Sequence, residues 1–395
     1  MTITLLLDLD DTLLDTNMEA FAPAYFRALS AALAADVAPE TMLPALMGGT
    51  RAMMVNTDPA QTLRQVFDAF FYPTLGLERT NLQDRIDLFY DQDFPALQHV
   101  TRPRPQAVDF VEWAFAAGHR PVVATNPLFP LKAVHHRMRW AGIPPEKYRF
   151  ALVSSYETFH FTKETIAYFP ELLAQLGWPD EPAVMIGNDL AMDLLPARKA
   201  GLPVFWLGEG QDESHPDIPR GSFSDLRAWL EAADPDQLQP AFQTPESIVS
   251  LLRSTPAALA TLTAGLPPKA WLERPAPGEW CLTEILCHLR DVETETNLAR
   301  IRKVLQEDNP FLPSVVSDKW GEERNYAGQD GPAALREFTE ARKQSLALLE
   351  GTGEVWSRTA RHAIFGPTAL QELVSIVGGH DRAHIQQVRA AIRQE

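Results

Sequence analysis

The chain has 395 residues, of which 45% are hydrophobic and 22% charged, a composition typical of a globular protein with two or three domains. Its net charge of −17 excludes the basic surface that a nucleic-acid backbone requires, and no apolar run is long enough to cross a membrane. Only two cysteines occur, Cys281 and Cys287, and no signal peptide is recognisable, so we expect no disulfide framework and a reducing, cytoplasmic location.

The first predicted strand ends in a pair of acids. Residues 2–16 read TITLLLDLDDTLLDT, and the apolar run Ile3–Leu7 predicts a buried parallel strand. Alternation along an extended backbone places Asp8 and Asp10 on the same side, beyond the carboxyl end of the strand, where open α/β sheets bind ligands. A simpler interpretation is that these acids cap the helix that follows. From this stretch alone both interpretations are open.

The next elements are helical and then alternate with strands. Helical spacing of apolar residues over residues 16–99 predicts an inserted helical segment. The alternation that follows is typical of βαβ units and a parallel sheet. We predict strands at 121–124, 150–153, 183–186 and 203–207, separated by helices at 131–141, 164–176 and 191–200. The front part is therefore predicted to be a Rossmann-like α/β fold.

Further motifs follow the predicted strands or precede a helix, and they carry a family resemblance. They are Asp8-x-Asp10-x-Thr12 after the first strand, Thr125 and Asn126 after the second, Lys163 before a later helix, and Gly187-Asn188-Asp189 with Asp193 after the strand at 183–186. In this order the motifs resemble those of the haloacid dehalogenase-like (HAD) hydrolases. The helical segment 16–99 resembles the C1-type cap of that family, a lid that excludes water and selects the substrate.

The resemblance implies a reaction and a role for each motif. Asp8 would attack phosphorus to form an aspartyl-phosphate, and Asp10 would act as acid and base on the leaving alcohol and on water. Thr125, Asn126 and Lys163 would bind the phosphate. Mg²⁺ would be held by Asp8, the Asp10 main-chain carbonyl and a residue of the last motif. Because halide leaves without a proton, Asp10 favours a phosphatase acting on a small phosphorylated metabolite over a dehalogenase.

Two departures from the family pattern leave roles open. Asn188 follows Gly187 where the family often has Asp, so Asn188, Asp189 and Asp193 are all candidate metal ligands. Lys163 lacks the proline that commonly follows it, and a solvated surface lysine is its simpler interpretation.

The back part carries a mostly helical pattern. Helices are predicted at 245–266, 283–305, 332–349 and 368–393, which indicates a four-helix bundle. His380 and His384 are four residues apart, so they share one helical face and can bind one metal ion. His288, on the second predicted helix, can supply a third nitrogen.

The bundle also carries a family resemblance. A Gly278-Glu279-Trp280 turn, a helix with His288 and a terminal HxxxH followed by Gln together resemble the DinB-like family, in which three histidines so arranged bind a divalent metal. Zn, Ni, Fe and Mn all suit three nitrogen ligands, so the metal is open. Relatives in that family include thiol-dependent transferases, which implies a low-molecular-weight thiol as a candidate partner.

These patterns divide the chain into four predicted segments. They are an α/β core at 1–15 and 100–235, a helical cap at 16–99, a linker at 236–243 and a DinB-like bundle at 244–395. The chain would be a HAD-type phosphoric monoester hydrolase fused to a metal-binding bundle. The alternative is a catalytically inactive HAD scaffold or sensor with a bundle that serves for oligomerisation, in which case a second copy of the chain is the partner.

Overall fold

The chain forms two compact units in the computed structural model, which describes residues 1–208, 214–317, 319–350 and 353–392. Unit 1 comprises Met1–Tyr168 and Asp180–Ala241, and unit 2 comprises Phe169–Pro179 and Phe242–Glu395. The predicted last helix ends at position 393, which lies outside the described residues. Unit 1 is an α/β fold with a helical insertion and unit 2 is a helical bundle, so the predicted fold class is confirmed.

A parallel sheet of five strands forms the centre of unit 1, in the order β4-β1-β5-β6-β7. The strands are β1 (Thr4–Leu7), β4 (Arg120–Val123), β5 (Ala183–Gly187), β6 (Val204–Leu207) and β7 (Arg220–Gly221). Leu7, the last residue of β1, pairs with Val123 on one side and Ile186 on the other. Strands β4, β1 and β5 therefore end nearly level with one another, and the residues after them meet at one edge.

The strand predicted at 150–153 is wrong as a full strand. This segment makes an isolated parallel bridge, between Val153 and Val123, beside β4. Its residues are half-buried. Three main-chain hydrogen bonds of 2.9–3.0 Å, which involve Ala151, Leu152 and Ser154, still join the segment to β4.

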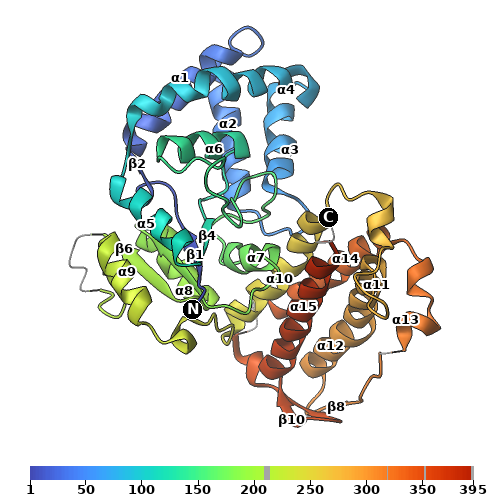
Figure 1. The fold of residues 1–395 in the computed structure, drawn as a ribbon. Coiled ribbons are helices and arrows are strands. Elements are labelled where there is room, and N and C mark those ends of the chain that lie inside the picture. Colours follow the sequence, from blue (N-terminus) through green and yellow to red (C-terminus); the bar gives the residue numbers. More distant parts are fainter. Residues whose placement is uncertain (209–213, 318, 351–352, 393–395) are drawn as a thin grey trace. The chain divides into compact units, whose positions relative to one another are not determined.

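The helices of this part of the chain belong either to the α/β part or to the insertion. Those of the α/β part are α5 (Pro105–Ala116), α6 (Leu131–Trp140), α7 (Tyr168–Gln175), α8 (Leu195–Ala200) and α9 (Phe223–Ala232). From Phe169 onward α7 belongs to unit 2. The insertion is built from α1 (Met18–Leu33), α2 (Pro39–Met54), α3 (Leu63–Leu75) and α4 (Arg79–Leu88), followed by a π-helical turn at Phe89–Asp93 and a 3-10 helix at Phe94–Val100. In Figure 1 helices α1 to α4 form a group of their own, with α6 beside them.

The insertion joins the core through a two-stranded ribbon. Strands β2 (Leu14–Thr16) and β3 (Thr101–Pro103) pair antiparallel, so the chain enters and leaves the insertion at one place. The sequence does not reveal this ribbon, because three-residue strands are too short to show a period. Inside the insertion, Phe21, Tyr25, Phe89 and Phe94 pack edge to face or stacked, which gives the segment an aromatic core of its own.

Unit 2 is a bundle of long helices with a small sheet. Its elements are α10 (Pro245–Thr263), α11 (Leu282–Val292), α12 (Leu298–Gln306), α13 (Trp320–Glu323), α14 (Gly331–Leu349) and α15 (Leu370–Ile392), with strands β8 (Phe311–Leu312), β9 (Thr359–His362) and β10 (Gly366–Ala369). The single helix predicted at 283–305 is α11 and α12, joined by a π-helical turn at Glu293–Asn297. The last helix begins at Leu370 and not at the predicted Thr368, because Thr368 pairs with Ala360 in the sheet.

A charged cluster lies inside the bundle. The Arg342 guanidinium on α14 contacts the Asp381 carboxylate at 2.5 and 3.0 Å and the Glu293 carboxylate at 2.9 Å. Exposed side-chain fractions of 1%, 0% and 1% for Arg342, Asp381 and Glu293 place all three charges away from water. Ser345, Asn297 and Thr255 donate further hydrogen bonds to the two acids, so the cluster is almost fully paired.

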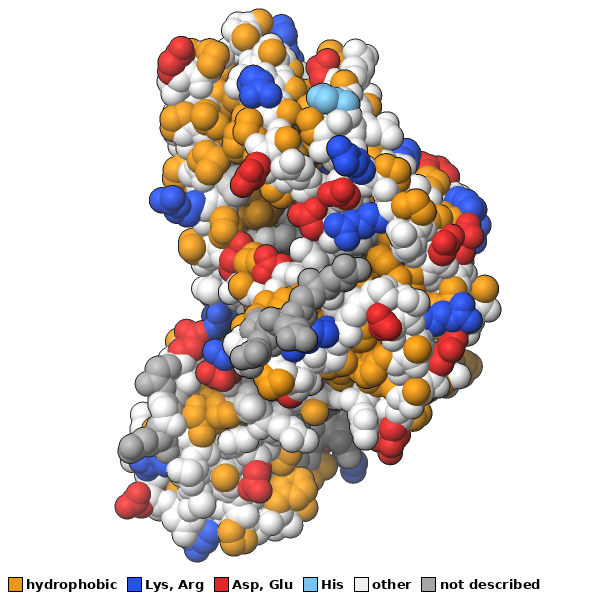
Figure 2. Space-filling model, turned by 90° about the vertical axis from the view of Figure 1, so that its left-hand side faces the viewer, with side chains coloured by type: hydrophobic (Ala, Val, Ile, Leu, Met, Phe, Trp, Pro, Cys, Tyr) orange, Lys and Arg blue, Asp and Glu red, His pale blue; other side chains and the backbone are white. Residues whose placement is uncertain are grey.

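The exposed surface agrees with the charge of the sequence. On the face drawn in Figure 2, the described Lys and Arg side chains stand singly among acidic and hydrophobic ones. Within the described ranges, no helix combines the length and the apolar character that a membrane crossing needs.

Candidate functional sites

A buried lysine joins two acids at the carboxyl edge of the sheet. Asp8 follows β1, and Asp193 follows β5 through a π-helical turn at Leu190–Leu194. Lys163 Nζ lies 2.6 Å from Asp8 Oδ1 and 2.6 Å from Asp193 Oδ1. Exposed side-chain fractions of 1%, 9% and 3% for Lys163, Asp8 and Asp193 exclude the interpretation of Lys163 as a solvated surface residue.

Burial and neighbouring charges shift the pKa values of Lys163 and Asp193. Burial disfavours the ammonium group, but the Asp193 and Asp8 carboxylates outweigh burial and raise the pKa of Lys163 above its ordinary value. Burial and then repulsion by Asp8 raise the pKa of Asp193 to about 7, against the attraction of Lys163. The single positive charge of Lys163 therefore does not balance the negative charges of the two buried carboxylates. A further cation would be attracted to these three side chains.

Asp10 lies in a different set of contacts from Asp8. Its carboxylate forms an ion pair with Arg137 of α6 and accepts a hydrogen bond of 2.8 Å from Thr16 Oγ1. Arg137 is buried, and its guanidinium lies 5.8 Å from the centre of the Phe21 ring and 5.3 Å from that of Phe129. The sequence reasoning missed Arg137. A signal was present, because Arg137 falls on the same helical stripe as the buried Ala133, Val134 and Met138.

Thr125 and Asn126 support the lysine from the end of β4. Asn126 Oδ1 accepts a hydrogen bond of 3.2 Å from the Lys163 main-chain N–H, and its amide group contacts the Glu164 carboxylate. Thr125 is buried, and its main-chain oxygen accepts bonds of 2.7 Å from Ser154 and 3.0 Å from Tyr168. These bonds hold the Lys163 loop without the proline that the family pattern has.

The structure separates the three candidate ligands of the last motif. Asp193 faces Lys163, whereas Asp189 Oδ1 accepts hydrogen bonds of 2.8 and 3.0 Å from the main-chain N–H groups of Ala191 and Met192, as a helix N-cap. Asn188 Oδ1 accepts a bond of 2.9 Å from Thr12 Oγ1. Gly187 is required here, because a Cβ at this residue would lie 2.2 Å from Asp193 Oδ2.

The acidic edge fits a magnesium ion in its donor set. Mg²⁺ takes oxygen ligands and commonly uses one or two carboxylates together with water. Asp8 and Asp193 offer two carboxylates around Lys163. Together with the main-chain carbonyl of Asp10 and water, they would form a donor set of the kind that Mg²⁺ uses.

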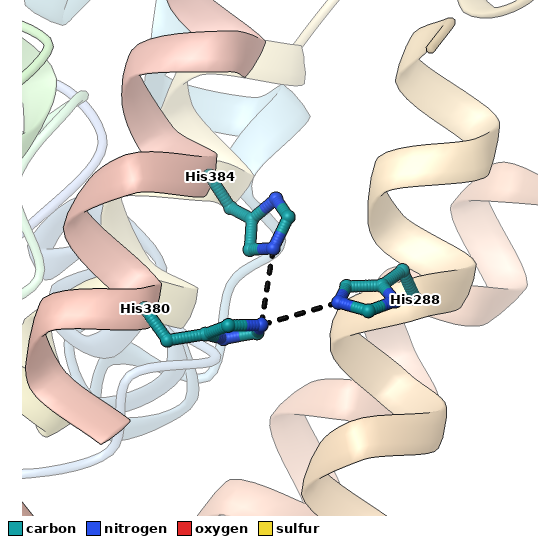
Figure 3. Close-up of side chains that lie close together, drawn as sticks. All are labelled: His288, His380 and His384. Atoms are coloured by element: carbon teal, nitrogen blue, oxygen red, sulfur yellow. Dashed lines mark hydrogen bonds between the residues drawn. The ribbon is translucent and has the colours of Figure 1, made fainter. Parts of the chain in front are cut away.

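The second candidate site lies in the bundle and consists of His288 on α11 and His380 and His384 on α15 (Figure 3). The Nε2 atom of His380 lies 3.1 Å from that of His288 and 3.1 Å from that of His384. Metal–nitrogen bonds of about 2.0–2.1 Å place neighbouring ligand nitrogens about 3.0–3.4 Å apart, and the two pairs that include His380 have this spacing. The ligand atoms of all three rings lie within 4.8 Å of one another.

The surroundings keep the three imidazole rings neutral, and a hydrogen bond fixes the orientation of the His384 ring. Burial lowers the pKa of His288 and His380 to about 3, assisted by the neighbouring histidines, and burial lowers the pKa of His384 as well. Gln387 Oε1 lies 2.8 Å from His384 Nδ1 and accepts a hydrogen bond from its N–H group. The Nε2 atom of His384 therefore carries the lone pair that can bind a metal. The Trp280 ring stacks on that of His384 at 6.2 Å and 5°, and so forms a wall of the site.

Residues 251–388 match the family model of the DinB superfamily. This range includes all three histidines, so the resemblance predicted for the back part is confirmed. Within the DinB-superfamily part, Cys287 is buried beside Gln329 and does not belong to the histidine group, as expected for a packing residue. His362 accepts hydrogen bonds from the main chain of Ile364 and Phe365 and also lies outside the group.

Solved structures match both parts of the chain. YfiT from Bacillus subtilis, a four-helix bundle described as a probable metal-dependent hydrolase, is 18% identical, covers 39% of this chain and 89% of its own, and has a TM-score of 0.36. A HAD phosphatase from Thermococcus onnurineus is 18% identical, and the match covers 61% of this chain and 100% of the phosphatase chain, with a TM-score of 0.36. A 2-haloacid dehalogenase from Pseudomonas syringae pv. Tomato DC3000 is 23% identical, and the match covers 58% of this chain and 99% of the dehalogenase chain, with a TM-score of 0.40. A comparison with curated proteins gives no match.

Proposed function

We propose that unit 1 is a Mg²⁺-dependent phosphatase that hydrolyses a small phosphorylated metabolite through an aspartyl-phosphate. The observation that carries this proposal is the buried bridge from Lys163 to Asp8 and Asp193 at the carboxyl edge of the sheet. A lysine buried between two acids supports the assignment of one acid as the nucleophile, of the lysine as a fixed cation and of the other acid as a metal ligand. This is the set of groups that phosphoryl transfer requires.

The proposed reaction assigns a step to each residue. Asp8 forms a bond to phosphorus as the bond from phosphorus to the leaving oxygen breaks, and Asp10 gives that oxygen a proton. Asp10 then takes a proton from water, which attacks phosphorus and releases inorganic phosphate from Asp8. Lys163 stabilises the negative charge on the transferring group, and Thr125 and Asn126 are positioned to bind its oxygens. Bound Mg²⁺ would neutralise phosphoryl charge between Asp8, Asp193 and the Asp10 carbonyl.

Removal of the metal tests this proposal directly. Because a metal ion contributes several kcal/mol of charge stabilisation, we expect chelated protein to release phosphate at least about 100-fold more slowly from a panel of phosphate esters. Added Mg²⁺ should restore the rate, whereas added Zn²⁺ alone should not. Phosphate release that is insensitive to chelation would contradict the assignment of a magnesium site.

For the bundle we propose binding of one divalent transition metal by His288, His380 and His384, with Zn, Ni, Fe and Mn as candidates. Three nitrogen ligands leave coordination positions open for water, a thiolate or another substrate. The convergence of three Nε2 atoms supports this proposal. Activation of a low-molecular-weight thiol is the chemistry that such an open site would perform.

We expect His384→Ala to lower the bound transition metal from about one equivalent to less than about one tenth, because two neutral nitrogens bind much more weakly than three. Elemental analysis of protein purified without chelators measures this loss. His362→Ala is the matched control, since it removes the remaining histidine of the bundle and should leave the metal content unchanged. Unmutated protein without any transition metal would contradict the site.

A second candidate function makes unit 1 a phosphate sensor or scaffold and unit 2 an oligomerisation module. The ion pair between Asp10 and Arg137 supports it, because a proton donor held by a cation is not free to act. Binding of phosphate without turnover of any ester, together with a dimer in light scattering, would favour this function.

A further inference from the structure

We propose that the enclosed cavity of the insertion binds the leaving alcohol of the substrate, and that this alcohol is an uncharged or cationic group with one aromatic or alicyclic ring. The proposal rests on the phosphatase function and specifies its substrate class. It places specificity in apolar residues of α1 to α3 and of the loop after β4, not in the phosphate-binding residues.

The size of the cavity fits a single ring with substituents. Its volume is about 220 Å³, and its walls include Phe21, Tyr25, Phe67, Phe71, Tyr90 and Phe129. A cavity of about 150 Å³ lined by apolar side chains accepts benzene, so this one has room for a ring and a short linking chain. Aromatic walls of this kind bind a ring through burial and through edge-to-face contact.

Two walls of the cavity lie near the proposed proton donor. Phe21 and Phe129 line it, and the same two rings lie against the Arg137 guanidinium that pairs with Asp10. Met18 lines it as well, two residues after Thr16, whose hydroxyl donates to Asp10. The carbon substituent of a leaving oxygen held at the Asp10 carboxylate would therefore extend past Arg137 toward this cavity.

The residues that line the cavity disfavour an anionic leaving group. No Lys or Arg is among the described residues that line it, and the neighbouring Arg137 and Arg79 are paired with Asp10 and with the lining residue Asp68. A carboxylate or a second phosphate would lose its water there without gaining an unpaired cation. The hydroxyl pair of Tyr25 and Tyr90, 2.9 Å apart, instead offers polar groups to a hydroxyl or amine on the ring.

Three primary alkyl esters test the proposal: benzyl phosphate, ethyl phosphate and 2-phosphoglycolate. Each has an alkoxide leaving group, so differences report recognition of the substituent more than bond strength. We expect kcat/KM for benzyl phosphate to exceed that for ethyl phosphate and for 2-phosphoglycolate by at least about tenfold, since each extra methylene in an apolar pocket is worth roughly tenfold or more. The gain should lie mainly in KM, because the ring is bound equally in the ground and transition states.

Two variants of the cavity and one control complete the test. Ala22→Leu fills the cavity from α1 and should lower the ratio of kcat/KM between benzyl and ethyl phosphate about tenfold. Phe67→Ala enlarges it and should raise the rate with 2-naphthylmethyl phosphate relative to benzyl phosphate. Ala31→Leu, on the exposed side of the same helix, should leave both ratios unchanged.

The outcomes separate this inference from the function on which it rests. Hydrolysis of these esters with a preference for 2-phosphoglycolate, or a benzyl preference that Ala22→Leu does not change, overturns the cavity assignment and leaves the phosphatase intact. Failure to hydrolyse any ester with Mg²⁺ overturns both.

Discussion

Asp8→Asn is expected to reduce phosphate release by at least about 10⁴-fold, because an amide cannot attack phosphorus and the covalent route is lost. The fold should survive the change. Asp8 and Asp193 are two buried acids that share one lysine, and removal of one negative charge relieves their repulsion. Steady-state assays on ethyl phosphate and a thermal melt of the same preparation measure the two effects.

Asp15→Asn is the matched control for this prediction. Asp15 is a half-buried acid on β2, close in sequence to Asp8 but without a contact to Lys163. Its variant should keep the activity of the unmutated protein. Turnover by Asp8→Asn above about one hundredth of the normal rate would show that another group is the nucleophile.

Arg342→Met is expected to destabilise unit 2 by roughly 3–5 kcal/mol. The Met side chain keeps an unbranched apolar stem but has no guanidinium, so it leaves Asp381 and Glu293 buried without a cation. With a urea dependence of about 1–3 kcal/mol per molar, the unfolding midpoint should fall by roughly 1–5 M. Circular dichroism in a urea series measures the shift, and a chelator in all samples removes any contribution of bound metal.

Arg336→Met on the same helix separates this effect from a loss of helix propensity. Arg336 is exposed, so its replacement should change the midpoint by less than about 0.5 M. A triple change of Arg342, Asp381 and Glu293 to apolar residues should recover part of the lost stability, because buried ion groups are often replaceable as a set. Equal midpoints for Arg342→Met and Arg336→Met would show that the buried cluster does not stabilise the fold.

Features that are encoded within a few residues could be predicted from the sequence. The strand before Asp8 follows from the run Ile3–Leu7, which is apolar except for Thr4, and its end places the acid at the edge of the sheet. His380 and His384 share a face because they are four residues apart on one helix. In both cases the local period of the backbone determines where the side chains point.

The partners of Asp10 could not be predicted in this way. Alternation along the strand predicts that Asp10 shares a site with Asp8, but its carboxylate is bound by Arg137, which is distant in sequence and reaches it only through the packing of α6. For a similar reason the sequence does not determine which of Asn188, Asp189 and Asp193 faces the lysine. An acid at the start of a helix is equally suited to capping and to a site, and only the π-helical turn brings Asp193 back to Lys163.

Helix α7 limits how the chain can be cut into two fragments, because it begins in unit 1 and continues in unit 2. The helix begins at Tyr168, whose hydroxyl bonds to Thr125, yet Phe169–Pro179 belong to unit 2. There the Trp178 carbonyl accepts a bond of 2.9 Å from Gln386, and Trp178 is 2% exposed. A fragment that stops at the linker would keep this tryptophan and lose Gln386, while the complementary fragment would lose the tryptophan. Neither fragment therefore keeps all the contacts of unit 2, and the two proposed sites are best tested separately by point variants of the intact chain.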